Sequence, residues 1–232
     1  MIFDVLNDLI KGHEKTPSTR FHKTAYVQGE SDIFVHLDMK TLRKLAKTYC
    51  ESLSEREFHQ LITHEYHEFR MLAFLILVYR IRDDASLKAS LHLYDKYIYF
   101  ANNWDLVDAS SLYIVGRYVY DSKDEQWLMK YVESKNMWVN RVATVSCLYL
   151  VRKGEIDLPL RIIEMQLTHP HDLMHKANGW VLREVGKKDR NRLNQFIKKH
   201  YASMPRTTLR YAIERHESNI RKEILGGRFQ WM

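Results

Sequence analysis

Apolar residues recur at three- and four-residue intervals along almost the whole chain. That spacing is typical of one face of an α-helix and differs from the strict alternation of a half-buried β-strand. The pattern predicts a first helix from about Phe3 to His13, an irregular segment over residues 14–38, and a return to helix near Leu42. We therefore expect an all-α protein.

The helices beyond residue 50 follow one another with short polar breaks between them. Ser54-Glu55-Arg56-Glu57 has the sequence of a capping box, in which the Ser and Glu side chains bind free backbone amides, so a helix is expected to start there. The apolar spacing then predicts helices at about 65–80, 86–100, 104–120, 124–133, 137–152, 157–167, 172–186, 189–202 and 206–224.

These helices form pairs at a period of about 35 residues, which favours an α-solenoid of HEAT-like helical repeats. No linker or low-complexity segment divides the chain, so residues 1–232 are predicted to form a single domain. A length of 232 residues is enough for one domain or one short repeat array. Only 8 Gly and 4 Pro occur, too few for a chain rich in hairpins and tight turns.

A basic residue opens several of the predicted helices at a nearly constant interval: Arg70, Arg141, Lys176 and Arg210 stand 71, 35 and 34 residues apart. The first step is a double one, and its midpoint falls near residue 106, where two aspartates replace the expected cation. A solenoid of this kind presents a concave face lined by the second helix of each pair. The spacing thus predicts a concave basic face that is interrupted once by carboxylate.

The net charge and the cysteines limit the possible partners. Lys plus Arg number 36 against 29 Asp plus Glu, a net charge of +7 that suits nucleic acid or an anionic membrane surface but specifies neither. The longest apolar run, Met71 to Tyr79, is too short to cross a bilayer, and there is no signal peptide. Cys50 and Cys147 are isolated thiols that we expect to be buried and reduced.

A soluble, cytoplasmic monomer without a metal or other cofactor is expected. His64 and His67 stand three residues apart, whereas the zinc-protease motif places its histidines four apart, and the chain has no glycine-rich phosphate loop.

The segment Asn103-Trp104-Asp105-Leu106-Val107-Asp108 concentrates acid and aromatic side chains. Asn103 is suited to cap a helix, and Asp105 then lies in the first turn, where a negative charge is stabilised by the helix dipole. Trp104 and Asp108 are four residues apart and share a helix face. Asp108 lies beyond the first turn, so it needs water, a cationic partner or a function, and a salt bridge is the simplest alternative.

A second aromatic candidate lies in the predicted helix at 172–186. Lys176, Trp180 and Arg183 share one face of that helix. Gly179 costs about 1 kcal/mol in a helix interior, so it predicts the close approach of another backbone. Taken alone, Trp180 is more often a core residue than a ligand contact, and Arg141 is a charged helical residue with no assigned role.

Together these segments resemble the DNA alkylation repair family, the AlkD-like alkylpurine DNA glycosylases built from HEAT-like repeats. The likeness extends over roughly residues 40 to 220, and the match is weaker from Pro205 through Glu214. The three blocks that carry it stand in the family's order: Asn103-Trp104-Asp105-Leu106-Val107-Asp108, Trp138-Val139-Asn140-Arg141-Val142-Ala143 and Lys176-Ala177-Asn178-Gly179-Trp180-Val181-Leu182-Arg183-Glu184.

The resemblance implies excision of N3- or N7-alkylated purines from double-stranded DNA, which leaves an abasic site. It implies that Asp108 is the catalytic aspartate, that Trp104 and Trp180 are the paired tryptophans, and that Arg141 contacts the DNA backbone. Lys and Arg side chains along the concave wall, among them Lys176, Arg183 and Arg210, would hold phosphates.

The sequence departs from the family at residues 21–38, where active members carry an extra amphipathic helix with an aromatic residue. Phe21 and Tyr26 are the aromatic residues present there, but the segment lacks a clean helical pattern. Two alternatives to a glycosylase therefore stay open. One is a non-catalytic HEAT-like protein that binds branched or distorted DNA, and the other is a protein-binding helical scaffold whose acidic cluster is only structural.

Overall fold

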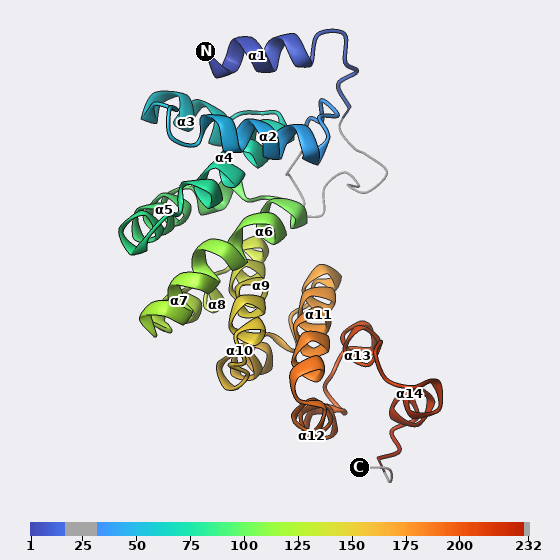
Figure 1. Cartoon of the computed structure of the whole chain (residues 1–232). Coiled ribbons are helices and arrows are strands. Elements are labelled where there is room, and N and C mark those ends of the chain that lie inside the picture. Colours follow the sequence, from blue (N-terminus) through green and yellow to red (C-terminus); the bar gives the residue numbers. More distant parts are fainter. Residues whose placement is uncertain (17–31, 230–232) are drawn as a thin grey trace. The chain divides into compact units, whose positions relative to one another are not determined.

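The computed structural model describes residues 1–16 and 32–229, and regular structure in these ranges is helical (Figure 1). Two isolated β-bridges join Thr16 to Phe34 and Ile33 to Tyr66. The prediction of an all-α helical repeat protein is confirmed. The chain divides into two compact units, Met1–Ser110 and Ser111–Met232, which are described in turn.

The first unit is organised around a buried helix, α4 (His67–Arg80). Every residue of α4 from 67 to 77 is buried, as expected for a helix that is covered on all sides. It packs against three neighbours, which are α2 (Met39–Tyr49), α3 (Glu55–Ile62) and α5 (Asp84–Lys96). The other helical segments of this unit are α1 (Ile2–Leu9), the 3₁₀ turn η1 (Ile98–Phe100) and the start of α6 (Trp104–Ser111).

Local sequence signals account for several helix ends in the first unit. The capping box predicted at residues 54–57 is confirmed, because the Ser54 side chain accepts from the Glu57 amide and the Glu57 side chain accepts from the Ser54 amide. The first helix ends at Leu9, four residues earlier than predicted. The chain then turns through Gly12, whose φ of +80° is a conformation that glycine adopts without strain.

In the second unit α6 continues through a π-helical turn, η2 (Leu112–Gly116), into α7 (Arg117–Ser122). A π turn leaves a carbonyl without its usual helical partner, and the Ser146 hydroxyl donates to the Ser111 carbonyl at 3.3 Å. The remaining helices are α8 (Gln126–Val132), α9 (Met137–Arg152), α10 (Asp157–Gln166), α11 (Asp172–Lys188), α12 (Arg190–His200), α13 (Arg206–Ala212) and α14 (Ser218–Leu225).

The helices of the second unit lie in two rows. The second helices of successive pairs, α9, α11 and α13, contact one another in order, while α8 and α10 pack on each other and on α9.

The prediction of a single helix over 206–224 is wrong, since the helix is broken between α13 and α14. Ile213 and His216 are buried at this break, and the His216 ring bonds to the Asn194 side chain at 2.9 Å. This tertiary contact overrides the helical pattern of the local sequence.

The repeat is regular along the chain. The second helices α4, α6, α9, α11 and α13 begin at residues 67, 104, 137, 172 and 206. Successive starts are 33 to 37 residues apart, so the period of about 35 is confirmed. None of the helices among the described residues is long and apolar enough to cross a membrane.

The two cysteines behave as predicted. Cys50 and Cys147 are both buried and form no disulfide. Burial raises the pKa of the Cys147 thiol, so that group stays protonated and unreactive.

The predicted close approach at Gly179 is confirmed. A Cβ atom built on Gly179 of α11 would overlap the Tyr211 Cβ and lie 2.7 Å from the Thr208 carbonyl oxygen, both on α13. The absence of a side chain at this position therefore allows α11 and α13 to pack backbone against backbone.

We predict that Gly179→Ala destabilises the protein by about 2 to 3 kcal/mol, because the added methyl group meets a backbone oxygen that cannot move aside. Gly226→Ala is the matched control, since the new Cβ there would meet only the end of the Arg228 side chain, at 3.1 Å. Chemical denaturation measures both changes. Equal stability of the two variants would contradict the packing assigned to Gly179.

Candidate functional site

The amino-terminal half of α6 has one buried face and one partly exposed face. Leu106, Val107 and Ser110 point into the first unit and are buried. Trp104 and Asp108 lie one turn apart on the opposite side, and both are partly exposed, as is Asp105 between them. The shared face predicted for Trp104 and Asp108 is therefore present, and we call Trp104, Asp105 and Asp108 the α6 face.

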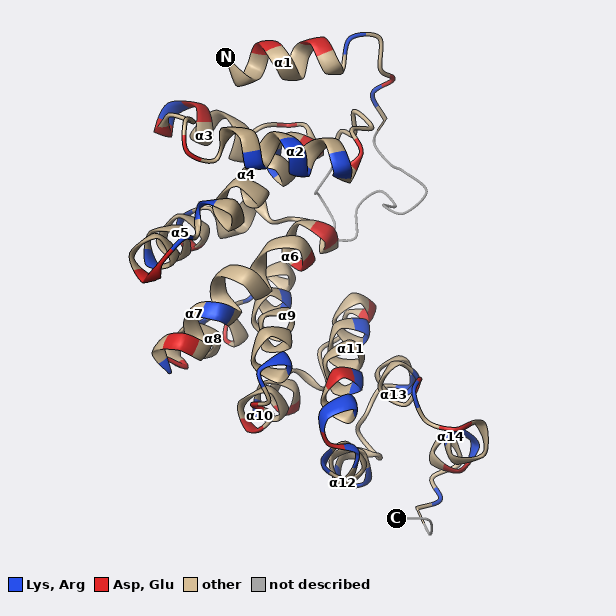
Figure 2. Ribbon diagram, in the orientation of Figure 1, with Lys and Arg blue, Asp and Glu red and all other residues tan. Residues whose placement is uncertain are grey.

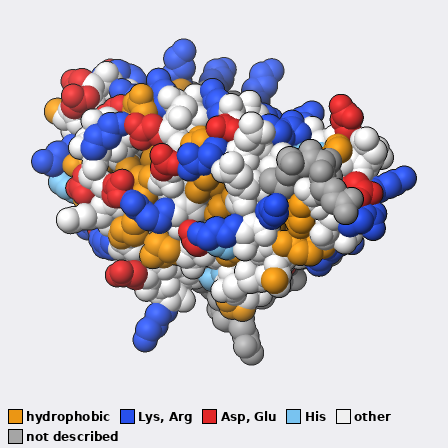
Figure 3. Space-filling model, turned by 90° about the horizontal axis from the view of Figure 1, so that it is seen from below, with side chains coloured by type: hydrophobic (Ala, Val, Ile, Leu, Met, Phe, Trp, Pro, Cys, Tyr) orange, Lys and Arg blue, Asp and Glu red, His pale blue; other side chains and the backbone are white. Residues whose placement is uncertain are grey.

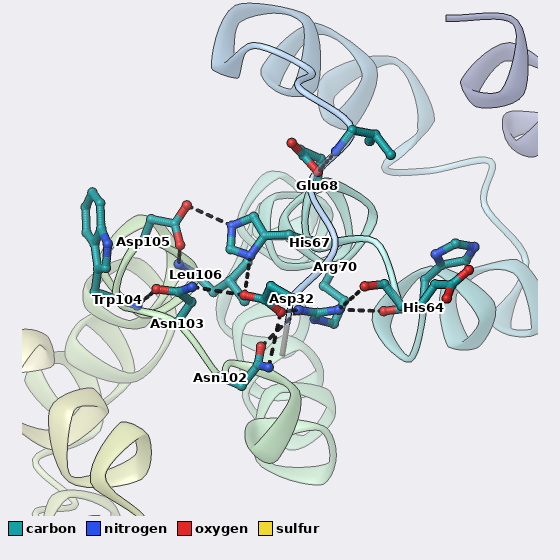
Figure 4. A network of polar contacts seen from close by, with 12 residues as sticks. Asp32, His64, His67, Glu68, Arg70, Asn102, Asn103, Trp104, Asp105 and Leu106 are labelled. Carbon is teal, nitrogen blue, oxygen red and sulfur yellow. Dashed lines mark hydrogen bonds and ion pairs between the residues drawn. The ribbon is translucent and has the colours of Figure 1, made fainter. Parts of the chain in front are cut away.

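Behind the α6 face lies a buried polar network centred on His67, the first residue of α4 (Figure 4). Its imidazole contacts two carboxylates: Nδ1 lies 3.0 Å from Asp32 Oδ2 and Nε2 lies 2.9 Å from Asp105 Oδ2. The side chains of His67 and Asp32 are 3% and 6% exposed, so both are shielded from water. The segment that contains Asp32, the start of α4 and the start of α6 thus meet at a single imidazole ring.

Asp32 accepts further hydrogen bonds from residues just before α6. The Asn103 amide donates to Asp32 Oδ2 at 2.9 Å and the Asn102 amide to Oδ1 at 3.3 Å, while the Arg70 guanidinium forms an ion pair with Oδ1. The expected cap at Asn103 takes an unusual form, because its side-chain oxygen accepts from the adjacent Trp104 amide at 2.9 Å. Asn103 therefore ties the start of α6 to the buried network.

The two carboxylates decide the protonation state of His67. Burial alone would lower its pKa, but the hydrogen bonds with Asp105 and Asp32 and the charges of both acids raise the pKa to about 9. Burial would likewise raise the pKa of Asp32, and the bond to His67 together with the Arg70 charge lowers it to about 2. At neutral pH the network holds an imidazolium between two carboxylates.

Arg70 does not belong to an exposed row of cations, and that part of the sequence interpretation is wrong. Its side chain is 6% exposed, and besides Asp32 it donates to the carbonyls of His64 and Glu65 at 2.7 and 3.1 Å. Arg70 is the fourth residue of α4. The fourth residues of α9 and α11, Asn140 and His175, also donate to a carbonyl six residues upstream. In α4, α9 and α11 this position fastens the second helix to the loop before it, whereas α6 and α13 carry Val107 and Leu209 there.

The other three cations of the predicted row occupy the fifth position of their helices, one residue after the position that Arg70 occupies in α4. Arg141, Lys176 and Arg210 are the fifth residues of α9, α11 and α13. The fifth residue of α6 is Asp108, and that of α4 is Met71. The repeat register therefore singles out Asp108, and not Asp105, as the carboxylate that stands where later repeats carry a cation.

Arg141, the first candidate in the second unit, is 4% exposed, and its Nη1 donates to the Leu173 carbonyl at 2.5 Å. Arg210 is exposed on α13. Lys176, Trp180 and Arg183 are all partly exposed and share one face of α11, as predicted. Lys176 pairs with Asp172 at 2.7 Å, and Arg183 pairs with Glu214.

Basic residues dominate some helices and alternate with acids on others. Figure 2 shows Lys and Arg on α12, whereas α11 carries both signs of charge. On the face drawn in Figure 3, basic side chains are interspersed with acidic ones and do not form a continuous patch. Within residues 1–16 and 32–229, no group of three or more His, Cys, Asp or Glu side chains is arranged to hold a metal ion.

Sequence reasoning missed Asp32 and His67 as partners of α6. They lie 73 and 38 residues before Asp105, and nothing in the local pattern links them. The available signal was a histidine at the predicted start of a buried helix, where a polar ring needs partners. Phe21 and Tyr26, the aromatic candidates near the amino terminus, lie outside the described residues.

Comparison with known proteins decides the family. The family model described as "DNA alkylation repair enzyme" matches residues 2–216, nearly the whole chain. The chain belongs to the DNA alkylation repair enzyme family. The family assignment made from the three sequence blocks is thus confirmed, and with it a role in DNA repair. No curated protein matches the sequence.

A solved structure described as a predicted DNA alkylation repair enzyme from Enterococcus faecalis has the same fold. Its TM-score is 0.64 at 16% identity, and the match covers 93% of this chain and 94% of that one. At this identity the likeness establishes the fold alone.

The network makes stability depend on pH through His67. Its pKa in the folded state lies above the ordinary value of 6.5, so protonation favours folding. This contribution is complete below about pH 6.5 and is lost as the pH rises through about 9. We predict that His67→Gln abolishes about 3 kcal/mol of this pH-dependent stabilisation. Urea denaturation of both proteins between pH 6 and 10 measures it, and parallel stability curves would contradict a charged His67.

Proposed function

We propose that this protein is a DNA glycosylase that excises cationic N3- and N7-alkylated purines from double-stranded DNA. The chain belongs to the DNA alkylation repair family. The observation that carries the proposal is that Trp104 and Asp108 lie one turn apart on α6, with access to solvent. A purine alkylated at N3 or N7 already bears a positive charge and leaves readily. The enzyme therefore has little need of a strong general acid.

The demanding step is the development of positive charge on the deoxyribose as the glycosidic bond breaks. We propose that the Asp108 carboxylate stabilises this charge and orients the attacking water, as carboxylates do in glycoside hydrolysis. The Trp104 indole would pack on the sugar and attract the same charge through its ring quadrupole. Both groups are attached to one helical turn, so their mutual placement is fixed by the backbone of α6.

The surroundings of Asp108 favour an electrostatic role. On the buried side of α6, the Ser110 hydroxyl donates to the Leu106 carbonyl, and its oxygen lies 3.3 Å from the Tyr94 hydroxyl, which can donate to it. Tyr94 is fully buried, and burial raises its pKa, with the Asp108 charge adding to the effect. The buried side of α6 therefore contacts a neutral phenol of α5, so water screens the Asp108 charge from its exposed side alone.

For the DNA-binding surface we propose Lys176, Trp180 and Arg183 on α11 and Arg210 on α13. Arg141 on α9 is as buried as Arg70 and donates to the Leu173 carbonyl, so we do not propose it as a DNA contact. Lysine and arginine contacts to phosphate are independent of sequence and weaken with salt. Lys176 and Arg183 pair with acids in the free protein, so their contribution to binding is reduced by the cost of breaking those pairs.

The departure from the family at residues 21–38 favours a second candidate, a DNA-binding protein of the same family that recognises branched or distorted DNA without excising a base. It shares the proposed DNA-binding surface but assigns no chemical role to Asp108. Family membership supports both DNA-directed functions over a protein-binding scaffold.

We predict that Asp108→Asn lowers release of 7-methylguanine from methylated duplex DNA by at least about 100-fold, because the amide cannot stabilise the developing cation. Asp121→Asn, which removes an exposed carboxylate on α7, is the matched control and should release base at the rate of the unaltered protein. Chromatography of the freed bases measures both rates. Undiminished release by Asp108→Asn would remove that residue from the mechanism, and no release by the unaltered protein would favour the non-catalytic candidate.

We also predict that Arg210→Ala weakens duplex binding and makes the slope of log K against log salt shallower by about 1, since one phosphate contact is lost. Lys199→Ala on α12, a first helix of its pair and outside the proposed DNA-binding surface, should leave the slope unchanged. Fluorescence anisotropy with a labelled duplex at several salt concentrations gives both slopes. Identical slopes for the two variants would exclude Arg210 from the interface.

A further inference from the structure

We infer that His67 is a positioning residue for the α6 face: by bridging Asp32 and Asp105 it fixes the first turn of α6, and with it the placement of Trp104 and Asp108. The catalytic consequence of this inference rests on the proposed function. The structural part stands on contacts within the first unit alone.

The bridge is short and uses both ring nitrogens. Because Nδ1 contacts Asp32 and Nε2 contacts Asp105, neither nitrogen is left to act on a water molecule or a substrate. His67 is also 2% exposed, beneath the α6 face rather than on it. The arrangement therefore excludes general-base chemistry at His67 and leaves it a role in holding Asp105.

The ring itself is rigidly held. His67 lies at the start of α4, which is buried along most of its length, and the Phe34 ring packs on the imidazole with centroids 4.6 Å apart. The His67 amide donates to the Ile33 carbonyl at 2.9 Å. The Glu68 carboxylate accepts from the amides of Val35 and His36 at 3.0 and 2.8 Å. Segment 32–36 and the start of α4 thus form one support.

From this support, two contacts reach the start of α6. Asp105 accepts from His67, and Asn103 donates to Asp32, so the residues on both sides of Trp104 are fastened to the same buried base. Figure 4 shows the Trp104 indole extending away from the network, on the other side of the helix start. Asp108 is three residues after Asp105 on the same helix. Movement of the Asp105 anchor would therefore displace both Trp104 and Asp108.

The charges explain why a protonated histidine is needed. The groups that face His67 are Asp32, Asp105 and, through Asp32, Arg70, with Glu68 bound to backbone amides nearby. The charges of two carboxylates, one imidazolium and one guanidinium sum to zero. A neutral imidazole has one N–H, so it can donate to only one of the two acids. Loss of the proton would release either Asp105 or Asp32 and leave a buried negative charge uncompensated.

His67→Gln tests the inference, because glutamine cannot donate to both acids from this position. We expect the single-turnover rate of 7-methylguanine release, measured well below the melting temperature, to fall about 100-fold with little change in DNA affinity, the effect of a misplaced reacting group. Amide hydrogen exchange in the first turns of α6 should also accelerate. His216→Gln is the control: this histidine is also buried and bonds a side chain at 2.9 Å, but it lies between α13 and α14. It should change neither rate.

Asp105→Asn serves as a conservative second variant, since the asparagine oxygen still accepts from His67 but no longer carries the charge that raises the pKa of the imidazole. We expect the alkaline limb of the rate–pH profile to move to lower pH by about one unit. If the network had only a structural role, Asp105→Asn would lower stability and leave the alkaline limb of the profile in place.

The outcomes separate the inference from the proposed function. An unchanged release rate in His67→Gln, with the unaltered protein active, would overturn the inference and leave the glycosylase proposal standing. If the unaltered protein releases no base, the glycosylase proposal fails and hydrogen exchange decides the inference. Faster exchange in the first turns of α6 in His67→Gln would support it, and unchanged exchange would refute it.

Discussion

The candidate site depends on one buried charge arrangement, an imidazolium held between two carboxylates. Removing charged groups from water costs several kcal/mol per ion, and the cost is offset only where geometry and hydrogen bonding are nearly complete. Here His67 uses both of its donors, and Asp32 accepts from four different side chains. The arrangement joins a segment near the amino terminus, the central helix of the first unit and the start of α6. The helix that carries Trp104 and Asp108 is therefore anchored through the buried side chains of His67 and Asp32.

The repeat architecture explains why a carboxylate can stand among cations. Two early positions of the second helices serve different purposes. The fourth position, Arg70, Asn140 or His175, binds carbonyls of the preceding loop and holds the helix in place. The fifth position carries a cation in α9, α11 and α13 and an acid in α6. The acid at the fifth position of α6 thus changes the chemistry of one repeat. The helix itself, whose fourth residue is Val107, is fastened through Asn103 and Asp105 instead. Function is placed on a regular fold in this manner in many repeat proteins.

The sequence predicted what is local and missed what is distant. Helical periodicity, the capping box at Ser54 and the close packing at Gly179 were all predicted correctly, because each depends on neighbouring residues or on a missing side chain. The charge of Arg70 was misread as surface charge, since composition cannot reveal that Asp32 lies opposite it. The break at residues 213–217 was missed for a similar reason, because a contact between His216 and Asn194 overrides a helical pattern that contains no glycine or proline. The pairing of His67 with Asp105 needs the fold before it can be seen.

The central claim is that the α6 face stabilises positive charge on a sugar. The most direct test compares two duplexes that differ only in charge at one abasic position, one with a cationic pyrrolidine and the other with a neutral tetrahydrofuran. A site complementary to the transition state should bind the cationic analogue more tightly, by about tenfold or more, and should lose that preference when Asp108 is neutral. Equal affinity of the unaltered protein for the two duplexes would contradict the claim.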